Sequence, residues 1–143
     1  MSNSRYSNGH TPGITLPSAD LQEKVIRKAY ADAGLDFADT DYVECHGTGT
    51  AVGDPIEVDA ISRCFSPRPS HPLLIGSVKS NLGNSEAASG LTSIMKAVVS
   101  FEHGGIPPTH GVVNINPKCT LQTTYESPHH LFFSFLLQML TLK

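Results

Sequence analysis

Apolar residues recur at intervals of three and four in two long segments of the chain, which is the pattern of an amphipathic helix. The first segment begins at Ser18, where Ser18 or Asp20 can cap the helix, and Gly34 can end it. The second begins near Ser85 and ends by Gly104-Gly105. We predict a helix in each segment and expect the second to be buried, because its first turn consists of small residues. The apolar stripes comprise Leu21, Val25, Ile26, Ala29, Tyr30 and Ala33 in the first helix, and Leu91, Ile94, Met95, Val98 and Val99 in the second.

Two short runs of residues have the length and composition of strands. Residues 41–46 form one run, and residues 73–78 form a second that is apolar enough to be buried. Between them, Asp54-Pro55-Ile56-Glu57 predicts a helix start with an acidic cap, a proline in the first turn, and a glutamate that reaches back to the cap amide. This helix is expected to end at about Phe65. Strands that alternate with helices predict an α/β fold, a mixed sheet with helices on its faces.

The chain divides into three parts that differ in residue composition and in the periodicity of apolar positions. Residues 1–17 hold turn formers without periodicity and are expected to be an extended lead-in, and residues 18–118 hold the predicted helices and strands. Residues 119–143 end in an apolar run, Leu131–Leu142, which is too short to cross a membrane. This run must be buried, either on the exposed edge of the sheet or against a second chain, and the sequence leaves both possibilities open.

Composition narrows the possible functions. The 143 residues include 39% hydrophobic and 16% charged residues with a formal net charge of −3, which argues against a nucleic-acid-binding arm or a disordered chain. The sequence carries no apolar span of membrane length and no signal-peptide pattern, so we expect a soluble, cytoplasmic protein. The three cysteines, Cys45, Cys64 and Cys119, have no metal-ligand spacing and are predicted to be free thiols.

Polar side chains follow each predicted strand, in residues 44–50 and residues 79–86. Both loops lead from a strand into a helix, so they are expected to open at the carboxyl edge of the sheet, where ligands of α/β proteins bind. The groups they offer suit the activation of a carbonyl or carboxylate. Each also has an ordinary structural interpretation: a hydrogen-bonded histidine, a glycine-threonine turn, a solvated lysine, or an acid in a first helical turn. The candidates are His46, Thr48, Thr50, Lys79, Asn84 and Glu86.

The motifs in these loops resemble a known family. They are His46-Gly47-Thr48-Gly49-Thr50 followed by Gly53-Asp54-Pro55-Ile56-Glu57, and then residues 76–83 (GSVKSNLG) followed by residues 86–90 (EAASG). In this order they are similar to the C-terminal half of the β-ketoacyl synthase (ketosynthase) domain of fungal iterative type I polyketide synthases. The resemblance runs from about Ser7 to Lys118. It implies part of a thiolase-like fold, and it implies substrates that are acyl chains linked to phosphopantetheine, with no bound cofactor and no metal.

The resemblance also implies roles for the candidates. His46 matches the first catalytic histidine, Thr48 and Thr50 match threonines that bind the pantetheine arm, and Lys79 matches the site lysine, which Glu86 would help to order. Asn84 stands where the family has its second catalytic histidine. An amide cannot transfer a proton near neutral pH, but it can donate a hydrogen bond to an oxyanion, and related condensing enzymes use cysteine, histidine and asparagine.

Two departures from the family pattern limit the expected activity. The family's nucleophilic cysteine belongs to the N-terminal half, which this truncated sequence is expected to lack. None of Cys45, Cys64 and Cys119 is placed to replace it, and Cys45 should face away from its neighbour His46. Ordinary condensation is therefore expected to be absent. After Asn116-Pro117 the sequence no longer follows the family, so the two closing strands are expected to be missing or replaced.

Three hypotheses remain. The chain is an enzyme that acts non-covalently on a polyketide acyl chain by cyclisation, isomerisation or hydrolysis, and this predicts that His46, Lys79, Asn84 and Glu86 converge in one pocket. Alternatively, it is an interaction module that binds a complete polyketide synthase, an acyl carrier protein or a second copy of itself, with Phe132, Phe133 and Phe135 in the interface. The third hypothesis is an inactive fragment. None of the three involves nucleic acid or a membrane.

Overall fold

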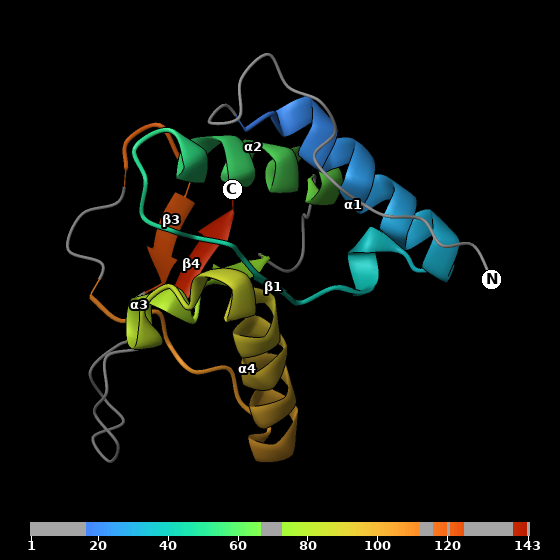
Figure 1. The fold of residues 1–143 in the computed structure, drawn as a ribbon. Helices are drawn as coiled ribbons and strands as arrows, with labels where there is room; N and C mark the ends of the chain where they lie inside the picture. Colours follow the sequence, from blue (N-terminus) through green and yellow to red (C-terminus); the bar gives the residue numbers. More distant parts are fainter. Residues whose placement is uncertain (1–16, 67–72, 112–115, 120, 125–138, 143) are drawn as a thin grey trace.

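The computed structural model describes residues 17–66, 73–111, 116–119, 121–124 and 139–142. The predicted lead-in and most of the tail, including Phe132, Phe133 and Phe135, lie outside these residues. No helix in the described ranges is both long and apolar enough to cross a membrane. The elements in chain order are α1 (Ala19–Ala33), η1 (Phe37–Asp39), β1 (Tyr42–Glu44), α2 (Gly53–Phe65), β2 (Leu74–Gly76), α3 (Lys79–Leu82), η2 (Glu86–Ala88), α4 (Ser89–His103), β3 (Leu121–Thr124) and β4 (Met139–Leu142) (Figure 1).

The sheet is mixed, which confirms the predicted fold class. Its strand order is β1-β2-β4-β3, with β1 parallel to β2 and the other neighbours antiparallel. Val43 lies opposite Ile75, and Ile75 lies opposite Leu140 on the other side. The end of the predicted apolar run, Met139–Leu142, is therefore a strand paired with the edge of β2. Strands β3 and β4 both come from the residues after Asn116-Pro117, where the sequence was expected to depart from the family.

Helix α1 begins and ends where its caps predict, whereas α4 ends at the predicted glycine but begins at Ser89, after the predicted start near Ser85, and has no side-chain cap. Ser18 Oγ accepts a hydrogen bond from Leu21 N at 3.4 Å, and Gly34 closes α1 with a φ of 65°. Gly104 closes α4 in the same left-handed conformation, with a φ of 62°. Glycine adopts this conformation without the steric penalty of a Cβ atom, which is why both helices stop at glycine.

Helix α2 begins differently from the prediction. It starts at Gly53, before Asp54, and no side chain caps it. Asp54 Oδ1 instead accepts from Thr50 N at 3.3 Å, while Thr50 Oγ1 accepts from Gly53 N at 3.1 Å. The predicted capping box is wrong because Glu57 does not turn back to its own helix. Its carboxylate accepts hydrogen bonds from backbone amides of the loop after β1. These amides need an acceptor just as the first amides of a helix do.

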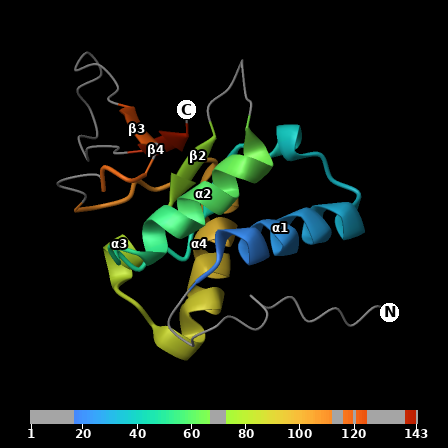
Figure 2. The same ribbon diagram turned by 90° about the horizontal axis from the view of Figure 1, so that it is seen from above.

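The hydrophobic core lies between α2, α1 and one face of the sheet (Figure 2). Stacked and edge-on aromatic rings connect these elements: Tyr30 stacks on Phe37 with centroids 4.2 Å apart, and both contact Phe65 edge-on at 5.6 and 5.0 Å. Such contacts add to the stabilisation from apolar burial. The buried members of this core are Cys45, Val58, Ile61, Cys64, Phe65, Leu73 and Ile75.

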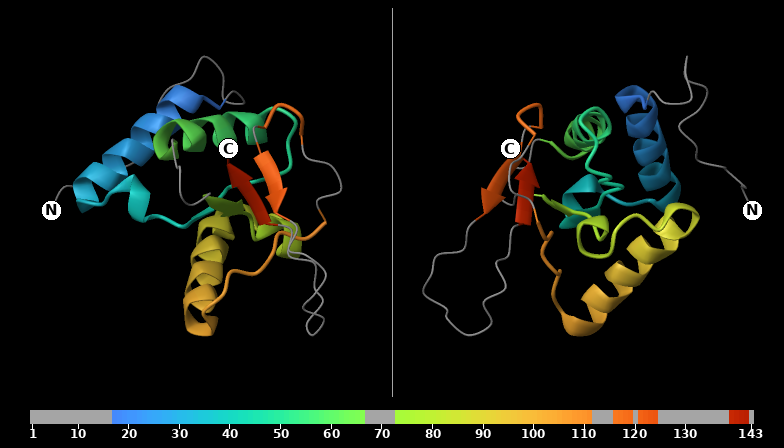
Figure 3. Two further views of the ribbon diagram at one scale, coloured as in Figure 1. Left: turned by 180° about the vertical axis from the view of Figure 1, so that it is seen from behind. Right: turned by 60° about the vertical axis from the view of Figure 1, so that its left-hand side comes forward.

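Helix α4 lies on the opposite side of the sheet from α1 and α2 (Figure 3). The prediction that its apolar stripe is buried is wrong for this chain. Leu91 is 67% exposed and Met95 is 65% exposed. Among the described residues, no element covers this side of the helix. The exposed large apolar residues of α4 and the turn before it are Leu82, Leu91, Ile94, Met95, Val98, Val99 and Phe101.

A buried ion pair joins α4 to the sheet. Lys96 Nζ lies 2.8 Å from Glu44 Oε2, with the two side chains only 5% and 10% exposed. Lys96 also donates to the Tyr42 hydroxyl at 2.8 Å, and that hydroxyl donates to Glu44. Burial and the hydrogen bond to Glu44 raise the pKa of Tyr42 far above its ordinary value, so the phenol remains protonated. The other oxygen of Glu44 accepts from Val78 N at 2.6 Å.

Lys96→Ala is expected to lower the free energy of unfolding by about 3–5 kcal/mol, because it leaves a buried carboxylate without its counter-ion. Urea denaturation of the full chain measures this loss. Lys24→Ala, which removes the same charge from an exposed position on α1, should change the free energy by no more than about 0.5 kcal/mol. Equal losses in the two variants would contradict the role of the ion pair.

Candidate functional site

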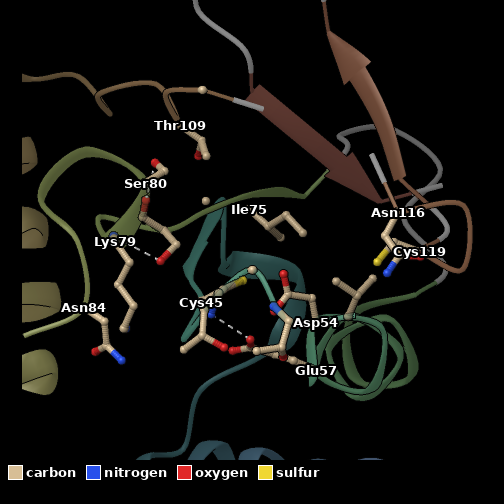
Figure 4. A pocket seen from close by; sticks show the side chains of 18 of the residues that line it. Cys45, Asp54, Glu57, Ile75, Lys79, Ser80, Asn84, Thr109, Asn116 and Cys119 are labelled. Atoms are coloured by element: carbon tan, nitrogen blue, oxygen red, sulfur yellow. Dashed lines mark hydrogen bonds between the residues drawn. The ribbon is translucent and has the colours of Figure 1, made fainter. Parts of the chain in front are cut away.

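A cavity of about 1070 Å³ opens at the carboxyl ends of β1 and β2 (Figure 4). Its walls come from the loop after β1, from the start of α2, from the turn around α3, from residues 109–111 and from Asn116, Pro117 and Cys119. Four of the six candidate residues line it: Thr48, Thr50, Lys79 and Asn84. The loops that follow parallel strands meet at one edge of a sheet, and this topology brings the four together.

Lys79 is the most unusual residue of this cavity. It is the first residue of α3, and only 9% of its surface is exposed. Within the described part of the chain, its ammonium group has no ion pair and no hydrogen bond. Figure 4 shows the side chains of Lys79 and Asn84 reaching the same side of the cavity. The side chain of Lys79 is largely covered while its ammonium group still reaches the cavity, so an anion or a polarised carbonyl that enters the cavity could pair with it.

Asn84 is oriented by its own turn. Its Oδ1 accepts from Glu86 N at 3.0 Å, so its amide nitrogen is left to donate. Glu86 itself is exposed, does not line the cavity, and has a φ of 47°, a left-handed conformation that is costly for a residue with a side chain. The turn therefore presents an amide donor to the cavity rather than a carboxylate.

His46 also lies outside the cavity lining. Its neighbour Cys45 is buried and lines the cavity, while His46 is exposed and does not line it. The prediction that the two side chains face opposite sides rests on the alternation of a strand. The alternation along β1 continues from Tyr42 and Glu44, which contact Lys96 of α4. The predicted convergence of four side chains is therefore met for Lys79 and Asn84 only, and Thr48 and Thr50 join these two in the cavity.

Two residues that hold the site loops, Glu57 and Gly47, have no catalytic signal in the sequence. Glu57 accepts from His46 N at 2.6 Å and from Gly47 N at 3.0 Å, so its carboxylate fixes the turn after β1. Gly47 has a φ of 47°, and a Cβ atom there would lie 2.6 Å from Ser77 Cβ. The turn needs glycine for both reasons. The glutamate of the Gly53-Asp54-Pro55-Ile56-Glu57 motif was the available signal, but the local pattern points to capping instead.

The three cysteines are free thiols, as predicted. Burial, with a further contribution from the charges of Glu57 and Glu44, raises the pKa of Cys45 well above its ordinary value. Burial, and then the charge of Asp54, also raises the pKa of Cys119, which lies in the cavity wall. A thiol with a raised pKa is a poor nucleophile near neutral pH. In the described ranges no group of three histidine, cysteine or acidic residues could hold a metal ion.

The fold and the cavity together define a piece of an α/β domain with a polar site at its carboxyl edge. The family described as "Beta-ketoacyl synthase, C-terminal domain" matches residues 1–113. The chain belongs to this family, and its fold is part of the thiolase-like fold of ketosynthases. The match ends before β3 and β4, so these two strands lie beyond the residues that the family covers.

Similar proteins include fungal polyketide synthases. The highly reducing polyketide synthase virA of Hypocrea virens is 70% identical over 116 residues, which are 81% of this chain and 5% of that protein. The highly reducing polyketide synthase srdA of Neurospora crassa is 73% identical over 112 residues, 78% of this chain and 5% of that protein. The chain therefore spans about one twentieth of the length of these relatives.

Solved ketosynthases have the same arrangement. The oxazolomycin ketosynthase domain OzmH KS7 of Streptomyces albus is 35% identical, with a TM-score of 0.73 over 78% of this chain and 20% of that chain. The ketosynthase from module 6 of the bacillaene synthase of Bacillus subtilis is 39% identical, with a TM-score of 0.71 over 78% of this chain and 21% of that chain.

Proposed function

We propose that this chain supplies the part of a ketosynthase site that binds an acyl chain linked to phosphopantetheine, and that it acts on this chain without forming a covalent bond. The observation that carries the proposal is Lys79, a residue only 9% exposed whose ammonium group faces a cavity at the carboxyl edge of the sheet and has no ion pair within the described residues. The ligand with the best chemical fit is a thioester whose acyl group ends in a carboxylate, such as a malonyl group.

Each cavity residue has a role in this proposal. Lys79 pairs with the carboxylate or polarises the thioester carbonyl, and the Asn84 amide nitrogen donates to the oxygen that becomes negative. Thr48 and Thr50 bind the amide groups of the pantetheine arm from the opposite wall. Thr50 Oγ1 already accepts from Gly53 N, so it can offer its own proton to a ligand.

His46 and Glu86 stay in the proposal with different requirements. His46 is proposed as the family's first catalytic histidine, and its backbone is fixed by Glu57. His46 does not line the cavity, so its side chain can act on a bound thioester only if part of the ligand extends out of the cavity to reach it. Glu86 is proposed to influence Lys79 through the turn that holds Asn84, because its amide is bonded to that side chain.

The proposed reaction is non-covalent because the described thiols are unsuited to acyl transfer. Cys45 has a raised pKa, Cys64 is buried with its Sγ 3.8 Å from Glu23 O, and Cys119 has a raised pKa in the cavity wall. Ordinary condensation is therefore proposed to be absent from the chain alone. Cyclisation, isomerisation or hydrolysis of a bound acyl chain needs no nucleophilic thiol.

Lys79→Met is expected to weaken the binding of malonyl-pantetheine by about tenfold or more, because it removes the partly desolvated charge that pairs with the carboxylate. Isothermal titration calorimetry of the full chain measures the dissociation constant. Lys24→Met makes the same change in charge on α1 and should leave binding unaltered. If both variants bind like the parent chain, Lys79 does not form the binding site.

The chain is expected to keep its mass after incubation with acetyl- or malonyl-pantetheine at pH 7.5, because no thiol is sufficiently ionised in a cavity that admits the thioester. Intact-protein mass spectrometry measures this. Alkylation in denaturant should modify all three cysteines, which establishes that the thiols were free to react. A stable acyl adduct on any of them would refute non-covalent action.

A second candidate function, an interaction module, is favoured by the exposed apolar side of α4. From residue 82 to residue 101 the only charged residues are Glu86 and Lys96, and Lys96 points inward to Glu44. A surface with few charged residues that carries several large apolar side chains has the composition of an interface core. Because the matched family is the C-terminal domain of a β-ketoacyl synthase, we infer that the N-terminal part of such a synthase covers this side of α4.

Met95→Glu is expected to abolish copurification of the chain with the N-terminal ketosynthase part of the Hypocrea virens relative, because a carboxylate would be buried without a partner. Tagged coexpression followed by size-exclusion chromatography with light scattering measures the complex. Ala31→Glu, on the exposed side of α1, should leave the complex intact. The inference would be contradicted if the parent chain forms only homodimers, or if it does not bind the N-terminal ketosynthase part at all.

A further inference from the structure

The Ser77 hydroxyl lies between the two loops that form the site. It donates to His46 O at 3.3 Å and accepts from Lys79 N at 3.3 Å, and Ser77 is only 6% exposed. Figure 4 marks the bond at the Lys79 backbone with a dashed line. A hydroxyl has one proton to donate, and this one directs it to the loop after β1 while it accepts from the loop after β2.

The surroundings of Ser77 leave it little freedom. Gly47 approaches so closely that a Cβ atom on it would lie 2.6 Å from Ser77 Cβ and 3.0 Å from its Oγ. On the far side of Gly47, its amide is held by Glu57 at 3.0 Å. A displacement of Ser77 therefore changes the position of the Gly47 turn, and a displacement of that turn changes the position of the amide that begins α3.

We propose that Ser77 is a positioning residue that couples the His46-Gly47-Thr48 turn to the start of α3, so that Lys79 and Thr48 keep a fixed separation across the cavity. Ser77 is a positioning residue rather than a catalytic one, because its hydroxyl is used by the backbone of the two loops. The coupling rests on the hydrogen bonds and the Gly47 contact alone. Its consequence for ligand binding rests on the proposed function.

Ser80 provides a matched control in the same turn. Its hydroxyl lies 2.9 Å from Ser77 O and accepts from His110 N at 3.1 Å. It therefore connects α3 to residues 105–111 and has no bond to the turn after β1. Loss of this hydroxyl removes hydrogen bonds of similar length from the same short segment, including one to Asn81 Oδ1 at 2.8 Å, but it leaves the proposed coupling in place.

Amide hydrogen exchange of the full chain tests the coupling without a ligand. In Ser77→Ala, the amides of Lys79 and Gly47 are both expected to exchange at least about tenfold faster, while amides of α1 are unchanged. The Gly47 amide is the decisive probe because its acceptor is Glu57, not Ser77. In Ser80→Ala, the His110 amide should exchange faster and the Gly47 amide should not.

Faster exchange at Lys79 alone would overturn the proposal, because it would mean that only the local bond was lost. If Ser77→Ala loses protection throughout α1 as well, Ser77→Cys is measured with the same criteria, since it keeps most of the side-chain volume and donates only weakly.

A double-mutant cycle extends the test to ligand binding. If Ser77 acts through Lys79, the effects of Ser77→Ala and Lys79→Met on malonyl-pantetheine affinity are expected to be non-additive by at least about threefold, whereas Ser80→Ala and Lys79→Met should be additive. Additive effects for the first pair would refute the functional consequence. A parent chain that does not bind the ligand would refute the proposed function, and the exchange rates would then decide the coupling independently.

Discussion

The ion pair between Lys96 and Glu44 is the interaction on which the arrangement of this chain depends. One oxygen of Glu44 receives the ammonium group and the Tyr42 hydroxyl, and the other receives the amide of Val78. The same carboxylate therefore orients α4 against the sheet and fixes the residue that precedes Lys79. Burial of charges offsets much of their mutual attraction, so the contribution of this pair lies mainly in the geometry that it specifies.

A second carboxylate does the same for the other half of the site. Glu57 belongs to α2 and accepts hydrogen bonds from two backbone amides of the turn that follows β1. Each site loop is thus fixed by a glutamate from a different element, and within the described residues the Lys79 ammonium group is left without an internal partner. Because Glu44 and Glu57 are both occupied by other groups, neither pairs with Lys79, which is largely buried and has no ion pair within the described residues.

The parts of the fold that could be predicted are those that local sequence determines. Ser18, Gly34 and Gly104 set helix ends by contacts within a few residues, and the runs at 41–46 and 73–78 contain the two parallel strands. The errors arose where a partner lies far away in sequence. Glu57 has the spacing of a capping residue but binds a loop eleven residues earlier in the chain. The spacing alone does not indicate which unpaired backbone amide lies nearest to it in the fold.

The same limit applies to α4 and to the site. A helical stripe of apolar residues indicates that a surface avoids water, but it does not indicate that this chain supplies the cover. The family motifs identify six candidate residues, and the alternation along β1 separates His46 from the cavity that Lys79 and Asn84 share. That separation depends on which face of the sheet each loop leaves, and the motifs do not contain this information.

The pairing of β4 with β2 concerns a part of the chain beyond the residues that the family covers. A strand edge offers backbone amides and carbonyls at a regular spacing, and these groups recognise an extended chain whatever its side chains are. The final segment of such a domain is consequently interchangeable to a degree that a helix cap or a buried carboxylate is not. A final segment of different sequence can therefore still pair with the edge of β2, provided that its backbone is extended.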